Sequence, residues 1–201
     1  MKHAGNADAA RKSKTKETLW ICLLRSINVG GHGKIPMATL REECQHLGFR
    51  NPATYIQSGN LLFKSDESSD EVLAAKLEHR LLEQHGVPTV AIFRTLEALR
   101  AAVEENPFKD EAKEAPSKLL VSFLRTKPDA AELPDLQSFA PGGERIALRG
   151  RELFIYFPEG AGQSKLNISR IEKVLGTPST ARNWNTVQKL IALAAERISA
   201  K

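Results

Sequence analysis

The stretch "ATYIQSGNLLFKS" (residues 53–65) decides the fold of the first half of the chain. Two short apolar segments are separated here by Ser58, Gly59 and Asn60, and glycine and asparagine readily take the positive φ of a tight hairpin turn. A hairpin makes two consecutive strands antiparallel, whereas parallel strands need a long crossover. The elements on either side of the hairpin therefore set the topology.

The flanking segments alternate between helix and strand. The almost wholly apolar run "TLWICLLR" (18–25) indicates a buried strand, and residues 36–48 carry apolar side chains at helical spacing. After the hairpin, residues 69–86 place their leucines on one helical stripe, and "VPTVAIFR" (87–94) closes the series as a strand. The order strand, helix, strand, strand, helix, strand predicts a ferredoxin-like plait.

The second half repeats this order with changes. Thr95 is a suitable N-cap for a third helix, and residues 107–117 are polar, charged and flanked by prolines, which indicates a linker loop. Beyond the linker we predict a strand, a short helix near 129–138, two strands, and helices near 169–175 and 182–198, so that a helix replaces the last strand. We find no sequence repeat between the halves.

These elements predict an α+β protein with antiparallel sheets and helices packed on one face of each sheet. The expected organisation is a disordered basic tail at 1–17, a first ferredoxin-like unit plus connecting helix at 18–106, the linker loop at 107–117, and a second, modified ferredoxin-like unit at 118–201.

Charge and composition narrow the function classes. The sequence pI is near 9.3, but the tail holds five basic and two acidic residues, a net +3 of the chain's +5. The folded body is therefore only +2, which is weak support for a nucleic-acid face. The tail lacks the apolar middle of a secretory signal, and no apolar run is long enough to cross a membrane, so we expect a cytoplasmic protein without a membrane partner.

Cysteines and histidines give little sign of chemistry. Cys22 lies in a predicted strand and Cys44 in a predicted helix, so we expect buried, reduced thiols. The histidines lack metal-ligand spacing, and no nucleophile elbow is present, so no metal is expected and catalytic residues stay unknown.

Five motifs resemble those of a bacterial family, domain of unknown function 1697. They are "LLRSINVGG", "TYIQSGN", "NPF", "GQSKL" and "TARNWNTVQKL", in that order, between Leu19 and Leu193. One departure is Ser26, where the family usually has glycine. The resemblance implies a pair of ferredoxin-like units and no established activity.

The glycine loop after the first strand is suited to an anion. Gly30, Gly31 and Gly33 allow successive N–H groups to converge, Lys34 adds a charge, and a helix N-terminus follows. Neither the Walker spacing nor the dinucleotide fingerprint is present, so no cofactor is expected. The alternative is a glycine-rich turn that only reverses the chain.

The motif "TARNWNT" (180–186) precedes the last predicted helix. Thr180 or Asn183 can cap that helix, and Trp184 falls on its apolar face. Arg182 then lies in or beside the first turn, where the helix dipole disfavours a cation. Its partner is either a bound anion or a carboxylate of the protein itself.

Several other segments have two interpretations. The loop "GAGQSKL" (160–166) suits an anion or is a plain surface loop, and Arg25, Arg94 and Arg125 each end a strand, where a solvent-exposed position is the simpler account. Phe154 and Tyr156 share one strand face, which offers either stacking rings for RNA or, as we favour, core side chains.

The resulting hypothesis is a cleft between the two units that binds a small phosphorylated or carboxylated ligand. Alternatives are a nucleic-acid binder that uses the basic tail and sheet surface, and a structural or protein-interaction domain without ligand. Oligomeric state is not predicted. The expected ligand-binding residues are Arg25, Asn28, Gly30, Gly31, Lys34, Ser58, Asn60, Arg182, Asn183 and Asn185.

Overall fold

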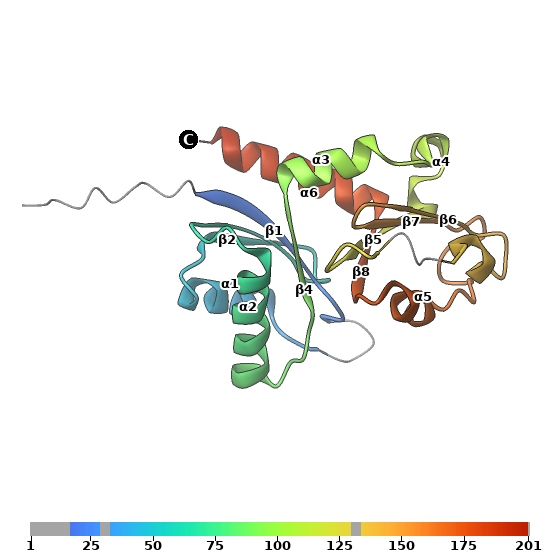
Figure 1. Cartoon of the computed structure of the whole chain (residues 1–201). Helices are drawn as coiled ribbons and strands as arrows, with labels where there is room; N and C mark the ends of the chain where they lie inside the picture. The colour runs from blue at the N-terminus through green and yellow to red at the C-terminus, as the bar shows by residue number, and fades with distance from the viewer. Residues whose placement is uncertain (1–16, 29–32, 130–133, 201) are drawn as a thin grey trace, which may run out of the picture.

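The protein forms two four-stranded antiparallel sheets, with strand orders β2-β3-β1-β4 and β6-β7-β5-β8 (Figure 1). The computed structural model describes residues 17–28, 33–129 and 134–200. The first unit consists of β1 (Thr18–Leu24), α1 (Met37–His46), β2 (Arg50–Tyr55), β3 (Asn60–Ser65), α2 (Asp70–His85), β4 (Ala91–Thr95) and α3 (Leu96–Glu104). The second consists of α4 (Lys109–Glu114), η1 (Pro116–Lys118), β5 (Leu119–Leu124), η3 (Leu136–Phe139), β6 (Arg145–Arg149), β7 (Glu152–Tyr156), α5 (Ile168–Leu175), β8 (Ser179–Asn183) and α6 (Trp184–Ser199).

The α+β class and the two plait-like units agree with the sequence. The predicted hairpin joins β2 to β3, with Tyr55 opposite Asn60. Gly59 has a φ of +74°, and a Cβ at this position would lie 2.9 Å from the Cβ of Leu24. Glycine is therefore needed here for both the turn and the close approach of β1.

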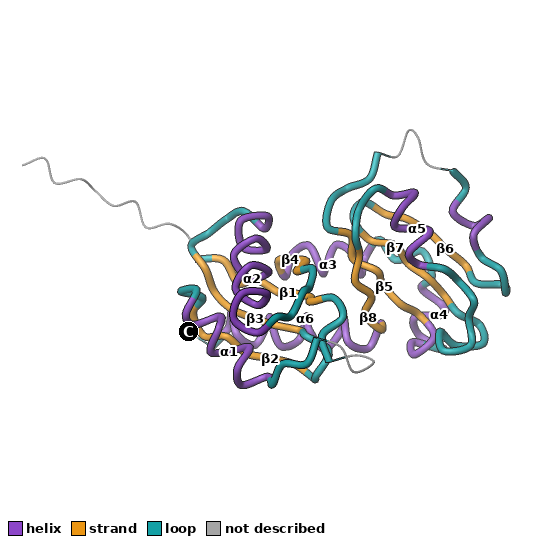
Figure 2. The backbone as a smooth tube through the Cα atoms, turned by 90° about the horizontal axis from the view of Figure 1, so that it is seen from below, coloured by secondary structure: helices purple, strands orange, loops and turns teal. Residues whose placement is uncertain are grey.

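Helices cover both faces of the first sheet, whereas the sequence predicted helices on one face. The helices α1 and α2 lie on one side, and α3 and α6 lie behind the sheet (Figure 2). A single core contains Ile21 of β1, Leu99 of α3, Phe123 of β5 and Leu190 of α6, all buried. Because α3 and α6 pack on both units, the two sheets share this core.

Two element predictions in the second half are wrong. The last strand is present as β8, and α6 starts at Trp184, with the side chain of its N-cap Asn183 accepting from the N–H of Asn185. The sequence "STARN" hid this strand because it has no apolar run. Residues 107–117 contain α4 rather than a loop throughout, since Asp110 and Glu111 favour a helix start.

Two other predicted segments lie partly outside the described residues. Around 129–138 the described residues show only the 3-10 turn η3, with Asp135 accepting from the N–H of Gln137. Of the predicted tail at 1–17, the structure describes Glu17, whose carboxylate pairs with Arg50 at 2.6 Å.

The strand registers relate the two units residue by residue. In β1, Cys22 pairs with Leu61 and Phe93, while in β5, Ser122 pairs with Leu153 and Ala181. The runs "LWICLLR" (19–25) and "LLVSFLR" (119–125) therefore correspond, although they share only three identical residues. This equivalence reveals a duplication that the sequence alone did not show.

A buried carboxylate joins α1 to α2. Glu43 is 7% exposed and accepts from Arg80 Nε at 2.5 Å and from His85 Nε2 at 2.9 Å. Burial raises the pKa of the Glu43 carboxyl, but hydrogen bonds from Arg80, His85 and His46 outweigh it and bring the pKa to about 2. Because the folded pKa lies below the ordinary value of 4.5, ionised Glu43 stabilises the fold above pH 4.5 and loses this effect as the pH falls toward 2.

We expect Glu43→Gln to lower the free energy of unfolding by about 1–3 kcal/mol at neutral pH, because Arg80 loses its negatively charged partner and an NH2 donor replaces one of the two acceptor oxygens. Urea unfolding should show this deficit shrinking between about pH 5 and about pH 2.5. The exposed neighbour Glu42 provides the control, and Glu42→Gln should change little at either pH. A deficit for Glu43→Gln that does not depend on pH would contradict the role of its charge.

Candidate functional site

A cavity of about 440 Å³ lies where the second unit meets the end of β1. Its size is in the range of small-molecule sites. Figures 1 and 2 place β8, which forms one wall, on the side of the second sheet that faces the first unit. The lining residues are Leu24, Arg25, Ser26, Ser58, Ser122, Ile168, Glu172, Ser179, Thr180, Ala181, Arg182, Asn183 and Thr186.

Arg182 is the buried cation of this cavity. It is 7% exposed, and its guanidinium reaches from β8 into the first unit. Its Nε donates to Asn60 Oδ1 at 2.6 Å, and its Nη2 donates to the carbonyls of Leu24 at 2.8 Å and Ser58 at 3.1 Å. Its Nη1 bonds Thr180 Oγ1 at 2.8 Å. All these acceptors are neutral.

No carboxylate pairs with Arg182 within the described residues. Burial therefore lowers the pKa of Arg182 to about 10. The guanidinium stays charged at neutral pH, because this value is well above 7. The sequence left two partners open for Arg182, a ligand or an internal carboxylate, and the described residues supply only neutral acceptors.

Arg94 occupies the equivalent position in β4, but its guanidinium has a carboxylate partner. Its Nη2 donates to the carbonyls of Leu124 at 2.8 Å and Arg151 at 3.1 Å, the counterparts of Leu24 and Gly59. Its Nε, however, donates to the carboxylate of Glu152 at 2.8 Å, where Arg182 has the amide of Asn60. Burial lowers the pKa of Arg94, and the Glu152 carboxylate opposes this shift.

A second reciprocal pair ties the units together. Arg25 at the end of β1 pairs with Glu172 of α5 at 2.9 Å, and Arg125 at the end of β5 pairs with Glu78 of α2 at 2.7 Å. Each carboxylate also accepts from the first backbone N–H of the adjacent edge strand, Ser179 or Ala91. These contacts hold β4 against α2 and β8 against α5.

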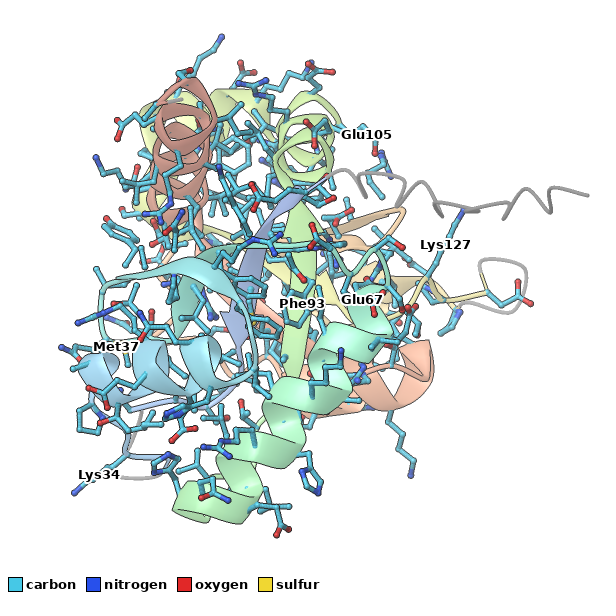
Figure 3. The ribbon with its side chains drawn as sticks, turned by 90° about the vertical axis from the view of Figure 1, so that its left-hand side faces the viewer. Lys34, Met37, Glu67, Phe93, Glu105 and Lys127 are labelled. Carbon is cyan, nitrogen blue, oxygen red and sulfur yellow. The ribbon has the colours of Figure 1, made fainter. Side chains whose placement is uncertain are left out.

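The equivalent hollow in the first unit is almost filled. Only about 10 Å³ of free space remains beside Arg125 and Arg151. The Arg151 guanidinium donates to Asp70 at 3.0 Å, and the Phe93 ring is buried (Figure 3). We call this filled hollow the closed side. In the strand registers, Gly59 corresponds to Arg151 of the closed side, and Ala181 corresponds to its Phe93. The small side chain of Ala181 on the cavity wall therefore leaves the cavity open, whereas Gly59 packs against Leu24 and Ile27.

Hydroxyl groups line much of the open cavity. Ser122 donates to Ser179 Oγ at 2.8 Å, and Ser179 donates to Glu172 at 2.8 Å, so these two are already committed. Among the described residues, the hydroxyls of Ser58 and Thr186 donate no hydrogen bond. They can therefore donate to a ligand.

The structure brings some predicted site residues together and separates others. Arg25, Ser58, Arg182 and Asn183 line the cavity, and Asn60 touches it through Arg182. Lys34 is exposed and points away from the protein (Figure 3), while Asn185 is exposed on α6. Neither residue lines the cavity.

The structure describes only part of the predicted glycine loop. Gly30 and Gly31 lie outside the described residues. Asn28 uses its side chain to bond the backbone of Ile35 and Gln57, so it closes the loop instead of facing the cavity. Ser26 has a φ of +57°, a conformation that glycine adopts more easily.

The account of strand-end arginines as solvent-exposed is wrong, since Arg25, Arg94 and Arg125 all pair across the unit boundary. The sequence did not indicate Ser122, Ser179, Thr186 or Glu172, which also line the cavity. Ser122 offered a signal, because it interrupts the apolar run "KLLVSFLR". A polar residue inside a buried strand indicates a polar cavity or network.

The loop "GAGQSKL" surrounds an internal carboxylate. Glu144 is 3% exposed and accepts from the Ser164 hydroxyl and from the N–H of Gly142 at 2.7 Å. These hydrogen bonds lower the pKa of Glu144, with that from Ser164 the largest cause. The loop therefore holds a charge of the protein itself, beside a smaller hollow of about 330 Å³.

The aromatic residues singled out earlier are mainly core. Trp184 and Phe154 are buried in the shared core, as we favoured, and the half-buried Tyr156 stacks against the Arg145 guanidinium at 5.3 Å. Both cysteines are free and buried, as expected, and burial raises the pKa of the Cys44 thiol to about 12.

Metal and membrane features are absent from the part of the chain that the structure describes. No group of three or more histidine, cysteine or acidic side chains there is placed to hold a metal ion. No helix among those residues is long and apolar enough to cross a membrane.

Residues 18–154 match the family described as "Protein of unknown function (DUF1697)". The chain belongs to this family. The match includes β1 and β3 but ends before α5 and β8, so the motifs "GQSKL" and "TARNWNTVQKL" lie beyond it. No curated protein matches the chain.

A solved structure has a similar fold. It is the conserved bacterial protein SP0830 from Streptococcus pneumoniae, with a TM-score of 0.63 and 24% sequence identity. The similarity covers 89% of this chain and 99% of that one. It supports the fold of this DUF1697 member and carries no activity.

The charge difference between Arg94 and Arg182 predicts unequal mutational costs. Arg94→Met leaves the Glu152 carboxylate, with a side chain 12% exposed, without its cation, and should cost about 3–5 kcal/mol. Arg182→Met leaves only neutral acceptors unsatisfied and should cost about 1–3 kcal/mol. Urea unfolding of the two variants measures both losses, and an equal or larger loss for Arg182→Met would contradict the asymmetry.

Proposed function

We propose that the protein binds a small anionic molecule, phosphorylated or carboxylated, in the cavity between its two units. The observation that carries this proposal is the buried Arg182 guanidinium, which has no carboxylate partner among the described residues although its equivalent, Arg94, has Glu152. An uncompensated buried charge is costly, and an anion in the adjacent cavity offsets that cost.

The remaining lining supports the same function. Arg25 contributes a second guanidinium, of which only Nη1 has a side-chain partner among the described residues, the Glu172 carboxylate. Ser58 and Thr186 add hydroxyl donors. The binding residues in this proposal are Arg25, Ser58, Thr186 and Arg182, with Asn60 and Glu172 holding the arginines in place.

The proposal also includes the ferredoxin-like fold of both units and a cytoplasmic setting. The strand order β2-β3-β1-β4, repeated in the second sheet, supports assigning both units to the ferredoxin-like fold. The two buried free thiols support a reducing, cytoplasmic setting. The nucleic-acid alternative gains no support from the sheet surface, because Phe154 is buried.

A thermal-shift panel of nucleotides, sugar phosphates and organic acids tests the function. A ligand at about 100 times its Kd should stabilise the protein by about 2.7 kcal/mol and raise Tm. Ala181 is exposed on the cavity wall, so Ala181→Phe should fill the cavity and remove the shift without disturbing the buried contacts.

The control is Ala38→Phe, which adds the same ring at an exposed position of α1 and should keep the full shift. A shift that survives in Ala181→Phe places the binding elsewhere. A panel in which no anion stabilises the wild-type protein refutes the function.

A further inference from the structure

We infer that the ligand of this cavity is a small hydroxylated monocarboxylate rather than a phosphorylated molecule. This inference rests on the proposed function and narrows its ligand class. It comes from comparing the open cavity with its closed counterpart in the first unit, which the strand registers align residue by residue.

The charge of the lining fits one negative charge. Arg25 and Arg182 contribute two positive charges and Glu172 one negative charge, a net of +1. Glu172 is fixed in the wall by Arg25 and by the N–H and hydroxyl of Ser179. A monoanion therefore neutralises the cavity, whereas a dianion leaves an excess negative charge that Glu172 repels.

The closed side shows how this architecture neutralises its arginine. Arg94 makes the same carbonyl contacts as Arg182, and one carboxylate, that of Glu152, balances its charge at 2.8 Å. Arg94 and Arg125 there contribute two positive charges, and Glu78 and Glu152 contribute two negative charges, a net of zero. A ligand carboxylate gives the open side the balance that the closed side has internally.

Space and hydrogen-bond donors define the rest of the ligand. Ala181 leaves open the volume that the Phe93 ring fills on the closed side, and the cavity measures about 440 Å³. The wall next to this space carries hydroxyls, of which those of Ser58 and Thr186 donate no hydrogen bond to any described residue. Such a wall recognises a polar, hydroxylated body better than an apolar one.

Three solutes with the same three-carbon skeleton separate charge from shape. Glycerol is neutral, glycerate carries one negative charge, and glycerol 3-phosphate carries close to two at neutral pH. Isothermal titration of the full chain should show glycerate binding about tenfold more tightly than glycerol 3-phosphate, with no measurable binding of glycerol.

Variants at Ala181 test the charge of the cavity without touching buried contacts, because this residue is exposed on its wall. Ala181→Asp adds a negative charge and should weaken glycerate binding about tenfold relative to the isosteric Ala181→Asn. Ala181→Lys should shift the preference toward glycerol 3-phosphate. Thr186→Val, which removes one free hydroxyl, should weaken glycerate binding about threefold to tenfold.

The outcomes separate this inference from the proposed function. If glycerol 3-phosphate binds the wild-type protein at least as tightly as glycerate, and Ala181→Asp weakens it, the anion site stands and the monocarboxylate inference fails. If glycerol binds as tightly as glycerate, or Ala181→Asp and Ala181→Asn behave alike, both fail. Absence of binding by all three solutes, with no stabilising anion in the wider panel, also overturns both.

Discussion

The buried guanidinium of Arg182 is the constraint on which the interpretation of this molecule depends. A charge removed from water needs an opposite charge or a full set of hydrogen bonds. The protein meets this need in two ways at two equivalent positions. Arg94 has carbonyls and the carboxylate of Glu152, whereas Arg182 has carbonyls and the amide of Asn60. The neutral acceptors around Arg182 accept its N–H groups but leave its positive charge unbalanced, and the open cavity lies beside it.

The junction between the units creates this situation. The helices α3 and α6 follow the edge strands β4 and β8 and pack into one core that both sheets share. Each edge strand is thereby held against the other unit, so its penultimate arginine reaches the carbonyls at the end of the opposite central strand. The reciprocal pairs of Arg25 with Glu172 and Arg125 with Glu78 stabilise the same arrangement. One side of the junction is filled by Arg151 and Phe93, and the other is open.

Membership of a family of unknown function leaves the site as the guide to what the protein does. The family match covers the β1 and β3 side of the cavity, while α5, β8 and the start of α6 complete it from beyond the matched residues. The lining that supports the proposed ligand binding consists of two arginines, one glutamate and several hydroxyl side chains. Both thiols are buried, and neither is among the described residues that line the cavity.

The sequence by itself determined the local structure, since the hairpin turn, the helix caps at Thr95 and Asn183 and the apolar strands depend on neighbours along the chain. It also predicted a ligand role for Arg25, Ser58, Arg182 and Asn183, which line the cavity, and for Asn60, which accepts from Arg182. Only the tertiary structure decided that β8 exists, that the strand-end arginines pair across units, and that one of two equivalent hollows is open. These features depend on contacts between residues up to 158 positions apart, as between Arg182 and Leu24, and on the size of side chains that meet only after both units have packed on α3 and α6.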